Sequence, residues 1–118
     1  MNYAAALAPV LAFASGPALA DFGAIAWSAQ TGGYGIGWKA AAKAEAERDA
    51  MGACAGYGRG CAVTLTFENA CGALAAGKSA AASAAAPRLR DAETKARAAC
   101  RKLDAQGCEI EVSFCSNR

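Results

Sequence analysis

Hydrophobic and polar side chains alternate along two segments of the chain. Residues 61–67 read CAVTLTF and residues 108–114 read CEIEVSF, so each segment places Cys or a large apolar residue at every second position. Successive side chains of a β-strand point to opposite faces, and this alternation is therefore typical of a strand with one buried and one solvated face. We predict a strand in each segment.

Two other segments carry small or apolar residues at positions i, i+4, i+7, i+8 and i+11, the spacing of one face of an α-helix. The positions are Ala46, Ala50, Ala53, Cys54 and Tyr57 in the first segment, and Ala92, Ala96, Ala99, Cys100 and Leu103 in the second. Because most of them are Ala, we expect both helices to pack close to a sheet. Asp91 is the predicted N-cap of the second helix, with Glu93 in its first turn and Gly107 as its C-terminal stop.

Two short segments upstream, residues 23–28 and 34–38, are predicted to form a β-hairpin across Thr31-Gly32-Gly33. In the second half of the chain, an Ala/Ser run at residues 78–86 stands in the place of the aromatic strand 34–38. Ala and Ser have low strand propensity, so this run could be a degraded edge strand, an extension of the second helix or a mobile loop. We favour a loop or frayed strand, with Pro87 just outside the helix.

The predicted elements recur in the same order in the two halves of the chain. Aligning the two helical segments makes residues 46–54 and 92–100 identical at five of nine positions, and the two alternating segments then align as well. This predicts a tandem duplication of a strand-strand-helix-strand unit, with repeats at about 21–70 and 71–118. The predicted fold class is α+β, with an antiparallel sheet packed by two helices.

The first twenty residues contain no Asp, Glu, Lys or Arg, and their apolar run leads to Ala18-Leu19-Ala20. This pattern is typical of a secretory signal peptide with an A-x-A cleavage site, and a short hydrophobic anchor is the alternative. Gly16-Pro17 interrupts the run after about a dozen residues, whereas a membrane-spanning helix needs about 20. We therefore predict a signal peptide at 1–20 and a single secreted or periplasmic domain at 21–118, without a transmembrane segment.

Six cysteines follow the predicted signal peptide: Cys54, Cys61, Cys71, Cys100, Cys108 and Cys115. An even number in a short exported chain predicts a disulfide framework, and none of the spacings is the C-x-x-C of a metal site. The repeat favours two equivalent local bridges, Cys54–Cys61 and Cys100–Cys108. Cys71 would then pair with the last cysteine and join the two units. Large apolar residues are few, so we expect each bridge, at about 2–4 kcal/mol, to supply a large share of the stability.

The composition excludes several classes of chemistry. The chain has no His, which removes Ser-His-Asp and Cys-His catalysis and His-ligated zinc. The net charge of +2 gives no indication of nucleic-acid binding. The glycines at 31–37 lie in the predicted hairpin, where a tight turn explains them better than a phosphate cradle. We predict no cofactor, no metal and no catalytic residue.

Trp27, Tyr34 and Trp38 form the one concentration of aromatic residues and are candidates for binding a partner. Core packing is the favoured interpretation, and an exposed member would be the best anchor for a protein partner. Asn69 lies at the junction of the two units, where a turn or backbone-capping role is expected.

Charged residues provide two further candidates. Residues 88–102 carry six basic against two acidic side chains, and Arg97 and Arg101 among them could meet a partner, although a solvated helix face is the favoured interpretation. Glu109 and Glu111 are expected on the same side of their strand, about 7 Å apart. The pair invites comparison with glycosidase carboxylates, but nothing else in the chain supports catalysis by it.

Four motifs carry a resemblance to a known family: residues 23–28, 31–35, 44–47 and 69–75. Through them the chain resembles the small exported bacterial proteins grouped as domain of unknown function 4189, over nearly all of residues 21–115. The resemblance implies secretion, disulfides and an α+β domain, and it supplies no established catalytic residue or ligand. The chain departs from the family at 78–86, where members usually carry a second Gly/aromatic strand.

Taken together, the sequence predicts a non-enzymatic protein-binding module of the inhibitor, immunity or effector type. Its expected partner is a protein or envelope component that the sequence does not name. One alternative is a small hydrolase or carbohydrate-active enzyme that uses carboxylates such as Glu68, Glu109 and Glu111. Another is a structural module of the cell envelope.

Overall fold

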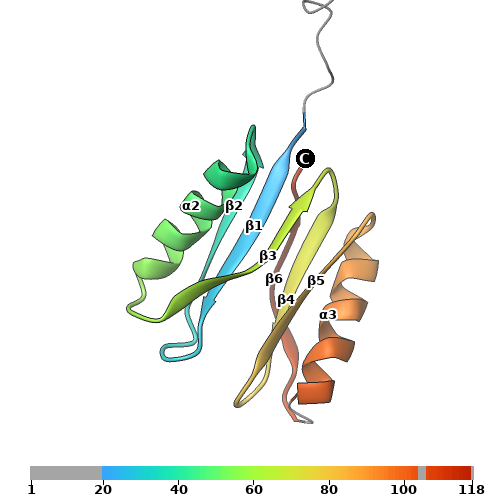
Figure 1. Ribbon diagram of the computed structural model, residues 1–118. Helices are drawn as coiled ribbons and strands as arrows, with labels where there is room; N and C mark the ends of the chain where they lie inside the picture. The colour runs from blue at the N-terminus through green and yellow to red at the C-terminus, as the bar shows by residue number, and fades with distance from the viewer. Residues whose placement is uncertain (1–19, 104–105, 118) are drawn as a thin grey trace, which may run out of the picture.

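The computed structural model describes residues 20–103 and 106–117 (Figure 1). Its elements are β1 (Phe22–Ser28), β2 (Tyr34–Ala40), α2 (Lys43–Ala55), β3 (Cys61–Glu68), β4 (Cys71–Ala76), β5 (Ala81–Ala86), α3 (Leu89–Leu103) and β6 (Glu109–Cys115). Apart from Ala20, the predicted signal peptide lies outside the described residues.

The strands form two antiparallel three-stranded sheets, with the orders β2-β1-β3 and β5-β4-β6. Each sheet is built from one half of the chain, and its middle strand is the first strand of that half. Figure 1 shows one helix on the outer side of each sheet. The predicted α+β class, with antiparallel strands, two helices and three disulfides, is confirmed, and its strands are divided between two sheets.

Residues 81–86 form the edge strand β5, which corrects the expectation of a loop or frayed strand in the Ala/Ser run 78–86. β5 pairs with β4 without a break, from Ala81 opposite Ala76 to Ala86 opposite Cys71. Its alternate residues pack in two directions, against α3 and against the centre of the molecule. Packing on both faces thus overrides the low strand propensity of Ala and Ser.

Each helix lies on the small-residue face of its sheet. Ala46, Ala50 and Cys54 of α2 are buried against Ala24 and Ala26 of β1. The neighbouring strand β2 also has glycines on this face. A Cβ atom on Gly37 would overlap a backbone carbonyl of α2. The small side chains therefore permit the close approach that the Ala-rich helix predicted.

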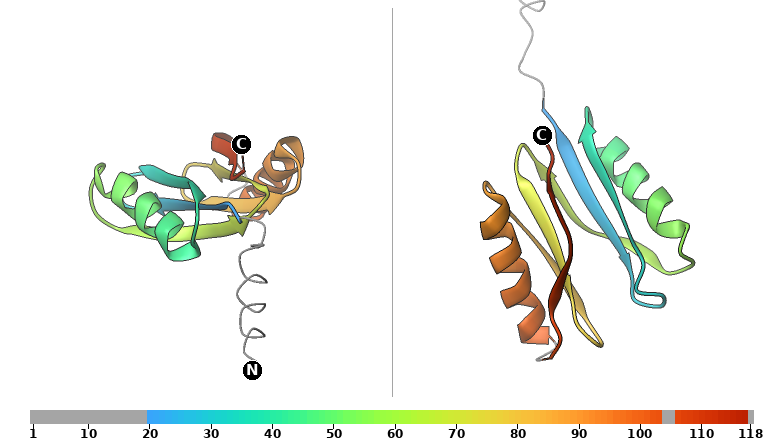
Figure 2. Two further views of the ribbon diagram at one scale, coloured as in Figure 1. Left: turned by 90° about the horizontal axis from the view of Figure 1, so that it is seen from above. Right: turned by 180° about the vertical axis from the view of Figure 1, so that it is seen from behind.

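The second helix packs on its own sheet in the same way. Ala92, Ala96 and Cys100 of α3 are buried in one cluster with Ala73 and Ala75 of β4. Figure 2 shows both arrangements from above and from behind, with α2 and α3 at opposite sides of the molecule.

Larger apolar side chains gather where the two sheets meet. Ile25, Phe67 and Leu74 are buried there, and they come from both sheets. The ring of Phe114 packs on that of Phe67, with 5.3 Å between the ring centroids. This central cluster holds the largest apolar side chains that the fold buries completely, Ile25 and Leu74.

A β-bulge divides the apolar residues of β3 between two faces. Leu65 lies opposite Ile25 and Val63 lies opposite Ala26, so Thr64 is an extra residue. Leu65 consequently packs in the central cluster, whereas Val63 is 37% exposed. The prediction of one buried face along this strand is wrong, because a bulge interrupts the alternation of side chains.

β6 has a bulge at the corresponding place. Val112 lies opposite Leu74 and Ile110 lies opposite Ala75, which makes Glu111 the extra residue. Ile110 packs in the cluster beneath α3, and Val112 packs in the central cluster. Both third strands therefore serve two apolar faces.

The three disulfides pair as predicted: Cys54–Cys61, Cys71–Cys115 and Cys100–Cys108. One detail is corrected, because the second of these bridges does not join the two halves. Cys71 begins β4 and lies directly opposite Cys115 of β6, so the bridge connects two paired strands of the same sheet.

The ends of α3 also differ in part from the prediction. The helix begins at Leu89, and the carbonyl oxygen of Arg88 accepts a hydrogen bond from the N–H of Ala92 at 3.0 Å. Asp91 is therefore a first-turn residue and not the N-cap, although its charge still faces the positive end of the helix dipole. Gly107 has a φ of 76° and lies between the end of α3 and β6; its role as the helix stop stays a prediction.

Asn69 caps the backbone of the strand β1, which confirms its expected role. Its side-chain oxygen accepts a hydrogen bond from the N–H of Asp21 at 3.0 Å, and its own N–H donates to the Asp21 carbonyl at 2.9 Å. Buried Ser116 makes the same pair of contacts with Ala70, just before β4. The residue after the third strand thus fixes the start of the first strand in both halves.

We predict that the bridge Cys71–Cys115 contributes more stability than Cys54–Cys61. The two bridges close 44 and 7 residues, and the loss of chain entropy in the unfolded state grows with loop length. Replacing both partners by Ala should lower the free energy of unfolding by about 4 kcal/mol for the long loop and about 2 kcal/mol for the short one. Urea unfolding followed by circular dichroism measures both, and equal losses would contradict the prediction.

A pair of glycine substitutions tests the close approach of α2 to its sheet. Gly37→Ala places a methyl group against the carbonyl of Ala46 and should lower the free energy of unfolding by about 1–3 kcal/mol. Gly52→Ala is the matched control on the exposed side of α2, where a Cβ meets nothing within 4 Å. It should raise the stability by about 0.5–1 kcal/mol. A neutral effect of Gly37→Ala in thermal or urea unfolding is the result that would refute the close approach.

Candidate functional site

The structure separates the three aromatic candidates. Trp27 and Tyr34 lie opposite each other on β1 and β2, are partly buried and pack against the central cluster, as the core interpretation predicted. Trp38 is 48% exposed, near the other end of β2. Only Trp38 therefore has the exposure expected of a protein anchor.

Trp38 lies at a β-bulge-like irregularity in the edge strand β2. The β1–β2 register shifts between Phe22 and Ala24, opposite Trp38 and Lys39. Lys39 has a φ of 54°, an uncommon conformation for a residue with a side chain. Its N–H donates to the carbonyl of Ser116 at 3.2 Å. The hydrogen bond holds this strained backbone in place.

The side chains of Trp38 and Lys39 also contact each other. The Lys39 ammonium lies 5.6 Å from the Trp38 ring centroid, within the range of a cation–π interaction. Together the two residues form a surface with an apolar face and a positive charge, which we call the Trp38 anchor.

The basic residues of α3 do not join this anchor. Arg101 is exposed and Arg97 is partly buried, and both lie on the helix that covers the second sheet. Trp38 belongs to the first sheet, and Figure 2 shows α3 and β2 on different sides of the molecule. The candidates from the sequence thus lie on two separate surfaces.

The structure also separates the carboxylates. Glu68 lines a hollow of about 250 Å³ together with Phe22 and Lys43, beside the start of α2. Glu111 lines a different cleft, and Glu109 lines neither of the two. Among the described residues, no group of three or more Cys, Asp or Glu side chains could hold a metal ion.

The cleft at Glu111 has a volume of about 350 Å³ and was not predicted from the sequence. It lies between the turn that joins β1 to β2 and the turn that joins β4 to β5. Its lining residues are Trp27, Ala29, Thr31, Gly32, Ala76, Gly77, Lys78, Ser79, Ala80 and Glu111. They come from three distant segments with no common motif, so the sequence pattern contains no signal for it.

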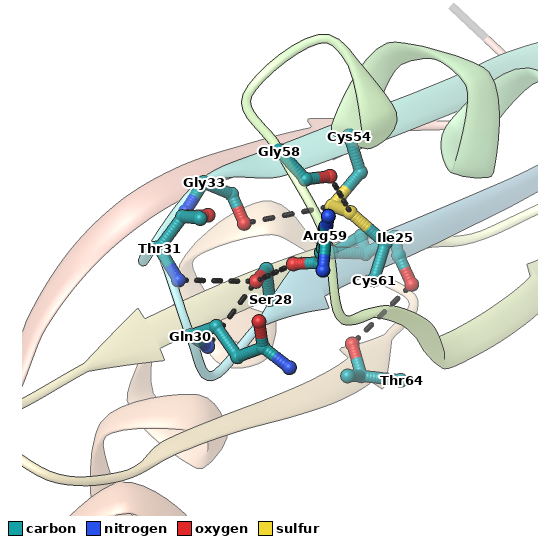
Figure 3. The surroundings of a disulfide bond; sticks show 10 residues. All are labelled: Ile25, Ser28, Gln30, Thr31, Gly33, Cys54, Gly58, Arg59, Cys61 and Thr64. Atoms are coloured by element: carbon teal, nitrogen blue, oxygen red, sulfur yellow. Dashed lines mark hydrogen bonds between the residues drawn. A yellow bond between two sulfur atoms is a disulfide. The ribbon is translucent and has the colours of Figure 1, made fainter.

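A buried hydroxyl holds the β1–β2 turn, which forms one wall of this cleft. Ser28 donates a hydrogen bond to the carbonyl of Arg59 at 2.6 Å and accepts one from each N–H of Gln30 and Thr31 (Figure 3). These contacts fasten the β1–β2 turn to the loop between α2 and β3. A disulfide closes that loop, so the cleft wall rests on a covalently stapled support.

Gly32 has a φ of 78° in the β1–β2 turn, which supports the tight-turn interpretation of this glycine. In the part of the chain that the structure describes, the helices are too short or too polar to cross a membrane.

Comparison with known protein families finds a match. The family model described as Domain of unknown function (DUF4189) matches residues 22–115. No curated protein matches the chain, and neither does any solved structure.

We predict that Ser28→Ala loosens the turn beside the cleft. The change removes a buried hydroxyl that makes three hydrogen bonds, and it should lower the free energy of unfolding by about 1–3 kcal/mol. Thr64→Val is the control, since it also removes a hydroxyl that makes hydrogen bonds, but these lie away from the β1–β2 turn; it should cost about 1 kcal/mol. Amide hydrogen exchange at Gln30 and Thr31 should accelerate only in Ser28→Ala. Unchanged exchange there would show that the hydroxyl does not hold the turn.

Proposed function

The chain belongs to the family Domain of unknown function (DUF4189), and from this premise we propose that it is a non-enzymatic module that binds a protein partner through Trp38. The observation that carries the proposal is the 48% exposure of this indole on an edge strand. Trp is enriched among the residues that dominate binding energy at protein interfaces.

The backbone around Trp38 supports the same role. Bulges re-aim side chains, and strained residues such as Lys39 concentrate at functional sites. An edge strand also presents unpaired N–H and C=O groups to which a partner strand can add. Since the hydrogen bond to Ser116 holds Lys39 in place before binding, the partner would not have to order this segment.

A non-enzymatic role is supported by the distribution of ionisable groups. The chain has no His, and Glu68 and Glu111 line different hollows. General acid–base catalysis by a carboxylate pair needs both groups at one reacting bond. This separation favours binding over hydrolysis.

We further propose that the protein is exported, with residues 1–20 as the signal peptide and 21–118 as the mature domain. Three disulfides in a small domain favour an oxidising compartment, the periplasm or the medium. A small stapled scaffold of this kind suits an inhibitor, an immunity factor or a secreted effector.

A tandem duplication is the proposed origin of the two halves. In each half, a helix Glu accepts a hydrogen bond from a hydroxyl of the third strand: Glu47 from Thr66 at 2.7 Å, and Glu93 from Ser113 at 2.6 Å. The equivalent bulges and the equivalent strand orders support the same origin.

The test is affinity capture from periplasmic extract and culture medium of the source bacterium. We expect the wild-type protein to retain a stoichiometric partner and Trp38→Ala to retain at least about tenfold less, because loss of a central aromatic anchor costs 2 kcal/mol or more. Tyr57→Ala, at a side chain that is 67% exposed, is the matched control and should retain the partner. Absence of any stoichiometric partner, or equal capture by Trp38→Ala, would refute the proposal.

A further inference from the structure

The cleft between the two turns lies where the two halves of the molecule differ. Trp27 pairs with Tyr34 across β1 and β2, and the corresponding pair in the second half is Ala76 with Ala81. Two small side chains thus stand where the first half has two large aromatic ones. One member of each pair, Trp27 and Ala76, lines the cleft.

The bulge residues of the two third strands differ as well. In β3 this residue is Thr64, whose hydroxyl contacts the Ile25 carbonyl at 3.3 Å and the Ser83 hydroxyl at 2.8 Å. In β6 it is Glu111, which lines the cleft. The same bulge therefore makes a structural hydrogen bond in one half and presents a carboxylate to the cleft in the other.

We propose that this cleft is a saccharide-binding site, a role separate from the Trp38 anchor. Its lining includes Trp27, a partly buried aromatic residue whose exposed part can meet the C–H face of a sugar ring. Glu111 can accept hydrogen bonds from sugar hydroxyls, and Lys78 and Thr31 can donate to them. These groups match a ring that is apolar on its face and hydroxylated at its rim.

The charges and the size of the cleft narrow the ligand further. Lys78 and Glu111 are of opposite sign, so the cleft favours a neutral ligand over an anion or a cation. Its volume of about 350 Å³ lies at the lower end of the range of small-molecule sites, about 300–1,000 Å³. We therefore assign it one or two rings of a neutral glycan.

The experiment uses Trp38→Phe as background. The chain has two Trp residues, so this variant makes Trp27 the only indole and its fluorescence a direct report on the cleft. Titration with chitotriose and with cellotriose, each also followed by calorimetry, should give a saturable change with at least one of them. Because this variant lacks the Trp38 anchor, its sugar binding tests the cleft alone. A failure of the saccharide proposal is therefore distinguishable from a failure of the proposed partner binding through Trp38.

Two substitutions of neighbouring carboxylates provide the matched comparison. Glu111→Gln should weaken saccharide binding by about tenfold or more, as expected for the loss of charge-assisted hydrogen bonds. Glu109→Gln changes an exposed carboxylate on the same strand outside the cleft lining and should bind within about twofold of the background. Thermal unfolding checks that both variants are folded.

Filling the cleft gives a third, steric test. Ala76→Met places a long side chain where the first half has Trp27, and it should abolish the fluorescence response. If Ala76→Met does not fold, Lys78→Ala at an exposed position replaces it and should weaken binding by about fivefold or more.

Three outcomes would overturn the assignment. They are the absence of a saturable response to both oligosaccharides at millimolar concentration, equal effects of Glu109→Gln and Glu111→Gln, and binding of the zwitterionic dipeptide Ala-Ala in place of either sugar. The last outcome would identify the cleft as a peptide site.

Discussion

The fold depends on how closely each helix approaches its sheet. Ala46 and Ala50 of α2 lie on the small residues of β1 and β2, and Ala92 and Ala96 of α3 do the same on β4. An Ala side chain removes little apolar area from water, so its contribution by burial is small. Short distances between backbones give the interface its dispersion contacts instead. Large side chains are then needed only where the two sheets meet.

This arrangement explains why both third strands are bulged. A regular strand presents one set of alternate residues to one face, but β3 and β6 border a helix layer at one end and the central cluster at the other. One extra residue, the bulge, reverses which side chains face the sheet's helix, at the point where the strand passes from the helix layer to the central cluster. Val112 can therefore reach the central cluster while Ile110, two residues earlier, packs beneath α3.

Much of the fold was predictable because its signals are local or repeated. The helical spacing of Ala and Cys identified both helices, and the equivalence of the two halves selected the three disulfide pairs. β5 was expected only as a loop or frayed strand because Ala gains its strand conformation from packing on two faces, which propensity does not contain. The assignment of Cys71 to a bridge between halves failed because Cys71 begins the first strand of the second half, where it pairs with the last strand of that same half. The cleft was missed for a related reason, since Trp27, Lys78 and Glu111 meet only through the tertiary fold.

The two candidate sites lie at opposite ends of β1, and this separation has a physical basis. Trp38 lies near the end where Asn69 and Ser116 fix the starts of the two middle strands. The cleft lies at the end where the turns meet, and Ser28 and a disulfide hold one of its walls. Because each end has its own hydrogen bonds, a substitution at one end need not disturb the other, and the two surfaces can differ while the Ala-rich layers between them stay the same. A scaffold fixed in this way loses little conformational entropy when either end binds a ligand.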